Sequence, residues 1–118
     1  MGKTKREIGS YFESKAAEFL KSRGCEILAA NFYCRFGEID LIVKDGAYIA
    51  FCEVKYRKSD KKGLPVEAVT RRKQKTISKC AVYYLTVHGF LHMDVRFDVI
   101  SVLDGQIDWI QNAFDYCG

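Results

Sequence analysis

Residues 38–55 (EIDLIVKDGAYIAFCEVK) predict a β-hairpin, and its side-chain pattern restricts what the rest of the chain can form. The Asp-Gly dipeptide at 45–46 is a strong turn signal because β-rich sequence flanks it on both sides. A two-residue loop at this point pairs Lys44 with Ala47 and fixes the register of the two strands. The core must therefore be built around a sheet that contains this hairpin.

The two faces of the hairpin differ in character, because successive side chains on a strand point to opposite sides. One face carries Glu38, Asp40, Phe51, Glu53 and Lys55, and the other carries Ile39, Leu41, Val43, Ala50, Cys52 and Val54. In the predicted register, Asp40 lies opposite Phe51 and diagonal to Glu53, and the two acidic residues have Cα atoms about 7–8 Å apart. Their carboxylates are then close enough to meet on one cation.

This acid pair and the lysine beside it are the groups that metal-dependent phosphodiester hydrolysis needs. Magnesium is commonly held by one or two carboxylates and keeps several waters. Asp40 and Glu53 are the candidate ligands, and Lys55 is the candidate that orients the attacking water. The alternative is the solvated face of an ordinary sheet, where alternating charged residues are common.

A strongly basic segment follows the hairpin. Residues 55–79 contain ten Lys and Arg residues against two acids, a net charge of +8, whereas residues 80–118 carry a net charge of −4. This basic segment lies beside the acidic site and is suited to bind a polyanion such as nucleic acid. The candidate phosphate contacts are Arg57, Lys58, Arg71 and Arg72. A solvated loop and helix surface is the alternative.

Composition excludes several classes of protein. With 48% hydrophobic and 29% charged residues, the chain is typical of a globular domain rather than of a disordered segment. Its apolar stretches are too short for a membrane span and its N-terminus lacks the apolar core of a signal peptide, so we expect a cytoplasmic protein with no membrane partner. The five cysteines form no C-x-x-C pair and are expected to be reduced core residues rather than zinc ligands.

Hydrophobic periodicity predicts a single α/β domain over residues 1–118. Helices are expected from Lys5 to Arg23 and, after a possible N-cap at Thr70, to about Val87. Besides the hairpin, strands are expected at 25–32, 93–102 and 106–110. The order α-β-β-β-α-β, with one further strand, favours a mixed central sheet flanked by two helices.

Glu13 lies on the first predicted helix, beside its apolar stripe. Small neighbours such as Ala16 and Ala17 leave space around its carboxylate, which could let it point toward the sheet. Spacing alone nevertheless favours an ordinary surface acid paired with Lys15 or Lys21.

Six stretches of the chain together resemble one bacterial protein family. They are 9–24 (GSYFESKAAEFLKSRG), 31–43 (NFYCRFGEIDLIV), 50–59 (AFCEVKYRKS), 65–77 (PVEAVTRRKQKTI), 96–102 (RFDVISV) and 112–114 (NAF). GEIDLI followed by EVK at this spacing is specific for the YraN family, small and mostly uncharacterised bacterial proteins regarded as endonucleases. That family belongs to the PD-(D/E)xK superfamily, has the restriction-endonuclease-like fold and is similar to archaeal Holliday junction resolvases.

The resemblance implies roles for particular residues. Asp40 matches the first motif acid, and Glu53 and Lys55 match the E-x-K motif. Glu13 matches the helix acid that completes resolvase-like sites, so the resemblance makes it an expected third metal ligand for Mg²⁺ or Mn²⁺. Ile39 stands where the superfamily's nominal proline would be, which leaves the metal ligands intact.

The leading hypothesis is an Mg²⁺- or Mn²⁺-dependent endonuclease acting on DNA, in particular branched or junction DNA. By the same resemblance, Lys73 and Gln74 fall where many relatives place a polar helix residue beside the site, and they join the expected nucleic-acid contacts. The alternative is a nucleic-acid-binding module that retains the fold without catalysis, and a protein-binding scaffold would leave the basic segment unexplained. A homodimer is a further expectation, because a two-fold junction suits a two-fold dimer.

Overall fold

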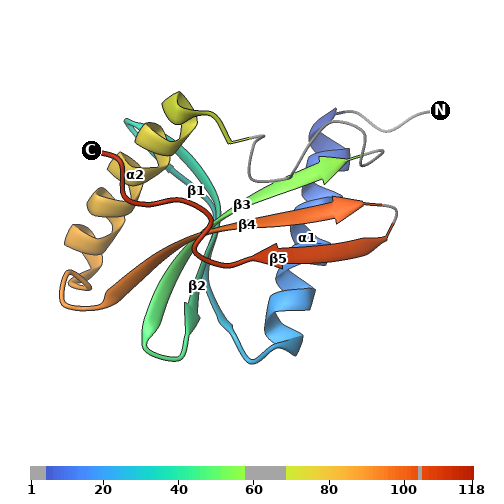
Figure 1. The fold of residues 1–118 in the computed structure, drawn as a ribbon, viewed down its shortest axis with the longest axis horizontal. Helices are drawn as coiled ribbons and strands as arrows, with labels where there is room; N and C mark the ends of the chain where they lie inside the picture. Colours follow the sequence, from blue (N-terminus) through green and yellow to red (C-terminus); the bar gives the residue numbers. More distant parts are fainter. Residues whose placement is uncertain (1–4, 58–68, 104) are drawn as a thin grey trace.

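The computed structural model describes residues 5–57, 69–103 and 105–118. Within these ranges, two helices and five strands follow one another in the order that the sequence predicts (Figure 1). They are α1 (Lys5–Ser22), β1 (Glu26–Cys34), β2 (Gly37–Asp45), β3 (Tyr48–Arg57), α2 (Arg71–His88), β4 (Asp94–Leu103) and β5 (Gln106–Ile110). The α/β prediction with two helices beside a mixed sheet is confirmed, and the first strand continues two residues beyond its predicted end.

The described strands form one mixed sheet in the order β1-β2-β3-β4-β5. Strands β3 and β4 run parallel, and the other neighbouring pairs are antiparallel. Parallel strands cannot be joined by a tight turn, so the chain between β3 and β4 passes through helix α2. The start of α2 lies beside the middle of β3, where Lys73 Nζ is 4.0 Å from Glu53 Oε2.

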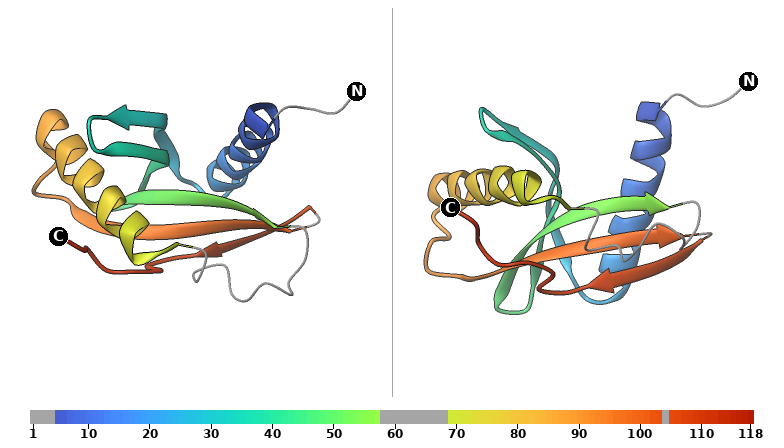
Figure 2. Two further views of the ribbon diagram at one scale, coloured as in Figure 1. Left: turned by 90° about the horizontal axis from the view of Figure 1, so that it is seen from above. Right: turned by 45° about the horizontal axis from the view of Figure 1, so that its top comes forward.

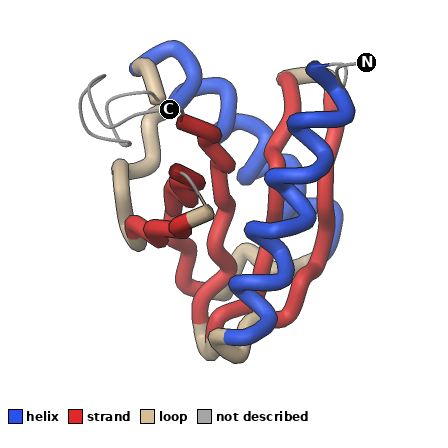
Figure 3. The backbone as a smooth tube through the Cα atoms, turned by 90° about the vertical axis from the view of Figure 1, so that its right-hand side faces the viewer, coloured by secondary structure: helices blue, strands red, loops and turns tan. Residues whose placement is uncertain are grey.

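The two helices cover opposite faces of the sheet, as the adjacent residues Ala50 and Phe51 show. Ala50 belongs to a cluster with Ala16 and Leu20 of α1, whereas Phe51 packs edge-on against Tyr84 of α2. Figure 3 shows α1 lying along its face of the sheet, and Figure 2 shows the strands separating the two helices. Among the described helices, none has the length and apolar character that crossing a bilayer requires.

Helix α2 begins and ends at the residues that capping chemistry favours. Thr70 Oγ1 accepts a hydrogen bond from Lys73 N at 3.2 Å, which satisfies one of the first free amides of the helix. Gly89 adopts a left-handed conformation with φ of 71° and donates to the last helical carbonyls. Thr70 is the N-cap that the sequence predicts, and the helix ends at His88, one residue beyond the predicted Val87.

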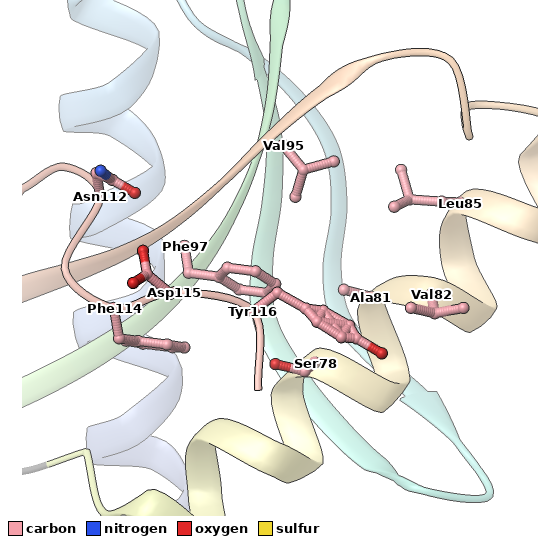
Figure 4. A pocket seen from close by; sticks show the side chains of 10 residues that line it. All are labelled: Ser78, Ala81, Val82, Leu85, Val95, Phe97, Asn112, Phe114, Asp115 and Tyr116. Atoms are coloured by element: carbon pink, nitrogen blue, oxygen red, sulfur yellow. The ribbon is translucent and has the colours of Figure 1, made fainter. Parts of the chain in front are cut away.

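The C-terminal segment closes the α2 side of the core. Phe114 and Cys117 are buried, and Cys117 N donates to Ser78 Oγ at 3.0 Å. A pocket of about 220 Å³ remains between this segment, α2 and β4 (Figure 4). All five cysteines are free and four of them are buried, in agreement with their prediction as reduced core residues.

The β2–β3 hairpin differs from its predicted register by two residues. The sequence pairs Lys44 with Ala47, but in the structure Asp45 pairs with Tyr48 and the two residues between them form the loop. Asp45 stays in the strand because its carboxylate accepts a hydrogen bond from Arg96 of β4 at 3.0 Å. A contact between residues so far apart in the chain leaves no local signal, so the predicted register is wrong.

This shift changes the neighbours of each residue, but the paired residues from Leu41 to Cys52 keep their predicted faces. Phe51 pairs with Ile42 rather than with Asp40. Asp40 and Glu53 nevertheless lie near each other, since the Asp40 carboxylate contributes to the raised pKa of Glu53. Ile39, expected on the reverse face, packs instead in the α2-side cluster together with Ile42.

Gly37, the first residue of β2, sits where a side chain would not fit. Its φ is 148°, and a Cβ there would lie 2.6 Å from Thr76 Cγ2 on α2. Gly37→Ala is therefore expected to lower the free energy of unfolding by about 2 kcal/mol, measured by urea denaturation. Adding Thr76→Ser, which removes that methyl group, should recover part of the loss.

Gly46 provides the comparison for this prediction. It also has a positive φ, 60°, but nothing lies within 4 Å of an added Cβ. Gly46→Ala should cost about 1 kcal/mol of backbone strain, and Thr76→Ser should not change that cost. Equal losses at Gly37 and Gly46, with no recovery by Thr76→Ser, would contradict the steric explanation.

Candidate active site

The sheet opens between β2 and β3 at one end. The two strands pair from Asp45–Tyr48 as far as Leu41–Cys52. Beyond that point, residues 37–40 stay in the ladder with β1, and residues 53–57 stay in the ladder with β4. Figure 2 shows the β1–β2 hairpin standing away from β3, in the space between the two helices. Polar groups on the separated strand segments can therefore face a common opening.

Asp40 bridges this opening. Its Oδ2 accepts a hydrogen bond from Val54 N at 2.8 Å, where the separated strands no longer form a backbone ladder. A carboxylate that accepts a hydrogen bond from a backbone amide in this way has a fixed orientation. Asp40 is thus held at the point where β2 and β3 part.

Glu53 lies across the opening from Asp40 and is 6% exposed. Within the described part of the chain, its Oε2 has no hydrogen-bond partner. Burial and then the nearby Asp40 carboxylate raise the pKa of Glu53 to about 8, although Lys73 and Lys55 act in the opposite direction. A buried carboxylate oxygen without a partner is unfavourable unless a cation or donor satisfies it.

Two lysines approach Glu53 from different elements. Lys55 follows it on β3, with Nζ 3.9 Å from Glu53 Oε1, and Lys73 extends from the first turn of α2, with Nζ 4.0 Å from Oε2. Both distances exceed that of a hydrogen bond, so the ammonium groups keep donors for another anion. The structure thus brings Asp40, Glu53 and Lys55 together, and α2 adds Lys73.

Glu13 reaches the same region from α1. Burial, followed by the carboxylates of Asp40 and Glu38, raises the pKa of Glu13 to about 7. Lys15, one of its two possible partners by spacing, lies 3.8 Å from Glu18. The structure therefore places Glu13 with the acids of the hairpin.

Asn31 and Glu38 join this acid cluster, although neither is among the predicted site residues. The Asn31 amide nitrogen, oriented by the surrounding carboxylates, lies 3.1 Å from Glu13 Oε2 and 3.2 Å from Glu38 Oε2. A pocket of about 300 Å³ is lined by all three residues. Glu38 has a sequence signal, since it precedes Asp40 by two residues on the same face. Asn31 has none, because its position depends on the pairing of β1 with β2.

The predicted nucleic-acid contacts occupy several different positions. Arg71 and Arg72 are exposed on the first turn of α2. Arg57 is partly buried at the end of β3. Gln74 Nε2 donates to a backbone carbonyl just before α2 at 3.0 Å, so its amide is engaged at the helix start. Lys58 lies outside the described residues.

The donor set fits a divalent cation that prefers oxygen ligands. Carboxylates are the side chains that Mg²⁺ and Mn²⁺ select. The unpaired Glu53 oxygen and the raised pKa values of Glu13 and Glu53 indicate that the ionised carboxylates are poorly stabilised by their surroundings, which a bound cation would change. In the part of the chain that the structure describes, no group of three or more His, Cys, Asp or Glu side chains is already arranged as a metal cluster. Enclosing a cation would therefore require the acidic side chains to move closer together.

Comparison with known proteins identifies the family. The family model described as uncharacterised protein family UPF0102 matches residues 12–102. A UPF0102 protein of Lachnoclostridium phytofermentans is 44% identical over 115 residues, which cover 97% of this chain and 98% of that protein. A UPF0102 protein of Caldicellulosiruptor saccharolyticus is 44% identical over 93% of this chain, and one of Vibrio campbellii is 42% identical over 93%. These two matches cover 98% and 93% of the respective relatives. The chain therefore belongs to the UPF0102 family, which is the YraN family that its motifs indicate.

Proposed function

We propose that this UPF0102 protein is a metal-dependent endonuclease that hydrolyses phosphodiester bonds of DNA. One observation carries the proposal: the opening that holds Asp40 and Lys55 also contains a buried Glu53 whose Oε2 has no hydrogen-bond partner in the described structure. Acids with a purely structural role are normally paired when buried. A metal ligand, in contrast, keeps an oxygen for the cation. Mg²⁺ or Mn²⁺ bound by Asp40, Glu53 and Glu13 would supply charge neutralisation at the phosphate and lower the pKa of a water.

The protein's own groups have separate roles in this proposal. Lys55, partly exposed and 3.9 Å from Glu53, would orient the attacking water and stabilise the negative charge that develops on the phosphate oxygens. Lys73, which approaches from α2, would bind a second phosphate oxygen. Arg71 and Arg72 would contact neighbouring phosphates, which gives affinity for DNA without base specificity.

Branched or junction DNA is the substrate structure that we favour. The support comes from the motifs, which resemble those of junction resolvases. A homodimer would match the two-fold symmetry of a four-way junction, and sedimentation of the protein with and without junction DNA measures this directly.

A nucleic-acid-binding module without catalysis is the second candidate. The observation that favours it is the charge balance at Glu53, where two lysines lie within 4.0 Å of one carboxylate. In that case the acids would stabilise the opening between β2 and β3. DNA binding would then survive Asp40→Asn, or strengthen because one negative charge near the phosphates is removed.

The deciding experiment compares labelled four-way junction, flap, linear duplex and single-stranded DNA, each with Mg²⁺, Mn²⁺ or EDTA. We expect cutting with either cation, none in EDTA, and a preference for the junction or flap. Asp40→Asn should bind DNA but not cut it. Cutting that persists in EDTA or in Asp40→Asn would exclude the metal mechanism, and binding without any cutting by the wild type would favour the second candidate.

A further inference from the structure

A second pocket, distinct from the acid cluster, lies where α1 meets the ends of β3, β4 and β5. Its volume is about 500 Å³. It is lined by Tyr11, Phe12, Lys15, Tyr56, Val102 and Ile107. This volume is within the range of pockets that hold small organic groups. The lining combines aromatic rings, the aliphatic side chains of Val102 and Ile107, and the cation Lys15.

The aromatic residues of this pocket form a connected group. The rings of Phe12 and Tyr56 stack with centroids 4.1 Å apart and an angle of 15°. Tyr11 meets Phe12 edge-on, with centroids 5.1 Å apart. Tyr11 is nevertheless 47% exposed and Tyr56 45% exposed. Packing against Phe12 therefore orders the two tyrosines without covering them, and ordered, exposed rings are suited to stacking with another flat group.

The position of the pocket links it to the acid cluster. Tyr56 follows Lys55 on β3, so the two side chains point to opposite faces of the strand. On α1, Phe12 of the pocket directly precedes Glu13 of the acid cluster, so the two sites are also adjacent along the helix. Along β3, Tyr56 lies three residues beyond Glu53, a distance of about 10 Å. A DNA strand whose phosphate lies at the acid cluster can therefore place a nearby base on the far side of β3.

Charge near the pocket also suits DNA. Lys15 Nζ lies 5.6 Å from the centroid of the Tyr11 ring, and nearly half of the lysine side chain is exposed. Lys55 and Arg57 flank Tyr56 in the strand. A base held on the aromatic rings would thus have cations close to its own phosphates.

We propose that this pocket binds one unstacked nucleobase of the DNA substrate, on the exposed surfaces of Tyr56 and Tyr11. The inference rests on the proposed function and narrows its substrate class. A base can enter the pocket only from a single strand, a strand end or a branch point, or after it is extruded from a duplex, which costs unpairing energy. The pocket therefore selects DNA with unpaired nucleotides beside the cleaved bond.

The test measures binding in EDTA, so that cleavage does not enter the result. Fluorescence anisotropy compares a labelled oligothymidine with an oligomer of the same length made of abasic tetrahydrofuran nucleotides, at one fixed salt concentration. The wild type should bind the oligothymidine about tenfold more tightly, since stacking on an aromatic side chain contributes this order of affinity per base. Tyr56→Ala should abolish the difference, and Tyr56→Phe should retain it.

Tyr83→Ala is the matched control, because Tyr83 is 42% exposed on α2, outside this pocket. It should retain the preference for bases. Thermal unfolding checks that each variant folds, and Tyr11→Ala replaces Tyr56→Ala if the latter does not. Equal binding of the two oligomers by the wild type, or equal weakening of both by the tyrosine variant, would overturn the proposal. If the preference is found but no DNA is ever cut, the pocket proposal stands and the nuclease proposal fails.

Discussion

Lys55→Ala is expected to lower the rate of metal-dependent DNA cleavage by about 10²–10³-fold while the protein still folds and binds DNA. Removing a single donor that stabilises developing charge in a transition state typically has this effect. Lys55 Nζ lies 3.9 Å from Glu53 Oε1, close enough to act on a phosphate beside the cation that the acids would hold. Its side chain is partly exposed, so the substitution leaves no buried cavity. The loss should therefore appear in the catalytic rate constant under single-turnover conditions.

Lys44→Ala is the matched control for this prediction. Lys44 is an exposed lysine on β2, near the turn end of the hairpin and away from the opening between β2 and β3. It should cut DNA at the wild-type rate. A small change in Lys55→Ala, or a similar loss in both variants, would show that Lys55 contributes only general positive charge. In that case Lys73, the second lysine beside Glu53, becomes the candidate for the catalytic role.

Local patterns in the sequence were sufficient for the elements and for the faces of the paired part of the hairpin. Thr70 marks the start of α2 because capping depends on residues within one helical turn. Leu41, Val43, Ala50 and Cys52 share the α1 side of the sheet, because alternation along a strand survives a register error of two residues. Ile39, beyond the paired part of the hairpin, does not follow this alternation.

Contacts between distant segments account for what the sequence could not predict. The hairpin register depends on the hydrogen bond from Arg96 to Asp45, two residues separated by the whole of β3 and the whole of α2. The opening between β2 and β3 arises because β1 retains one segment and β4 the other. Asn31 contacts Glu13 only because β1 and α1 meet beside that opening. None of these contacts has a periodic or spacing signal.

Glu53→Gln is expected to make the metal-free protein more stable at alkaline pH and nearly unchanged at pH 5. The pKa of Glu53 is raised from 4.5 to about 8 in the folded protein. Between these values the unfolded chain has released the proton and the folded protein still binds it, so stability falls as the pH rises through this window. A pKa that differs by one between the folded and unfolded states changes the free energy of unfolding by about 1.4 kcal/mol. Since Lys55 and Lys73 lie within 4.0 Å of Glu53 and favour its charged form, we expect a smaller net gain of about 3 kcal/mol for Glu53→Gln at pH 9.

Urea unfolding in EDTA from pH 5 to pH 9 measures this difference, with Glu26→Gln as the control because Glu26 is an exposed acid at the start of β1. The wild-type and Glu26→Gln proteins should lose stability together as the pH rises, while Glu53→Gln loses much less. Added Mg²⁺ or Mn²⁺ should then stabilise the wild type most strongly at alkaline pH, because the cation binds the deprotonated carboxylate, and should stabilise Glu53→Gln little. Parallel stability curves for all three proteins would show that Glu53 is already satisfied within the fold. The metal-binding role proposed for it would then lose its physical basis.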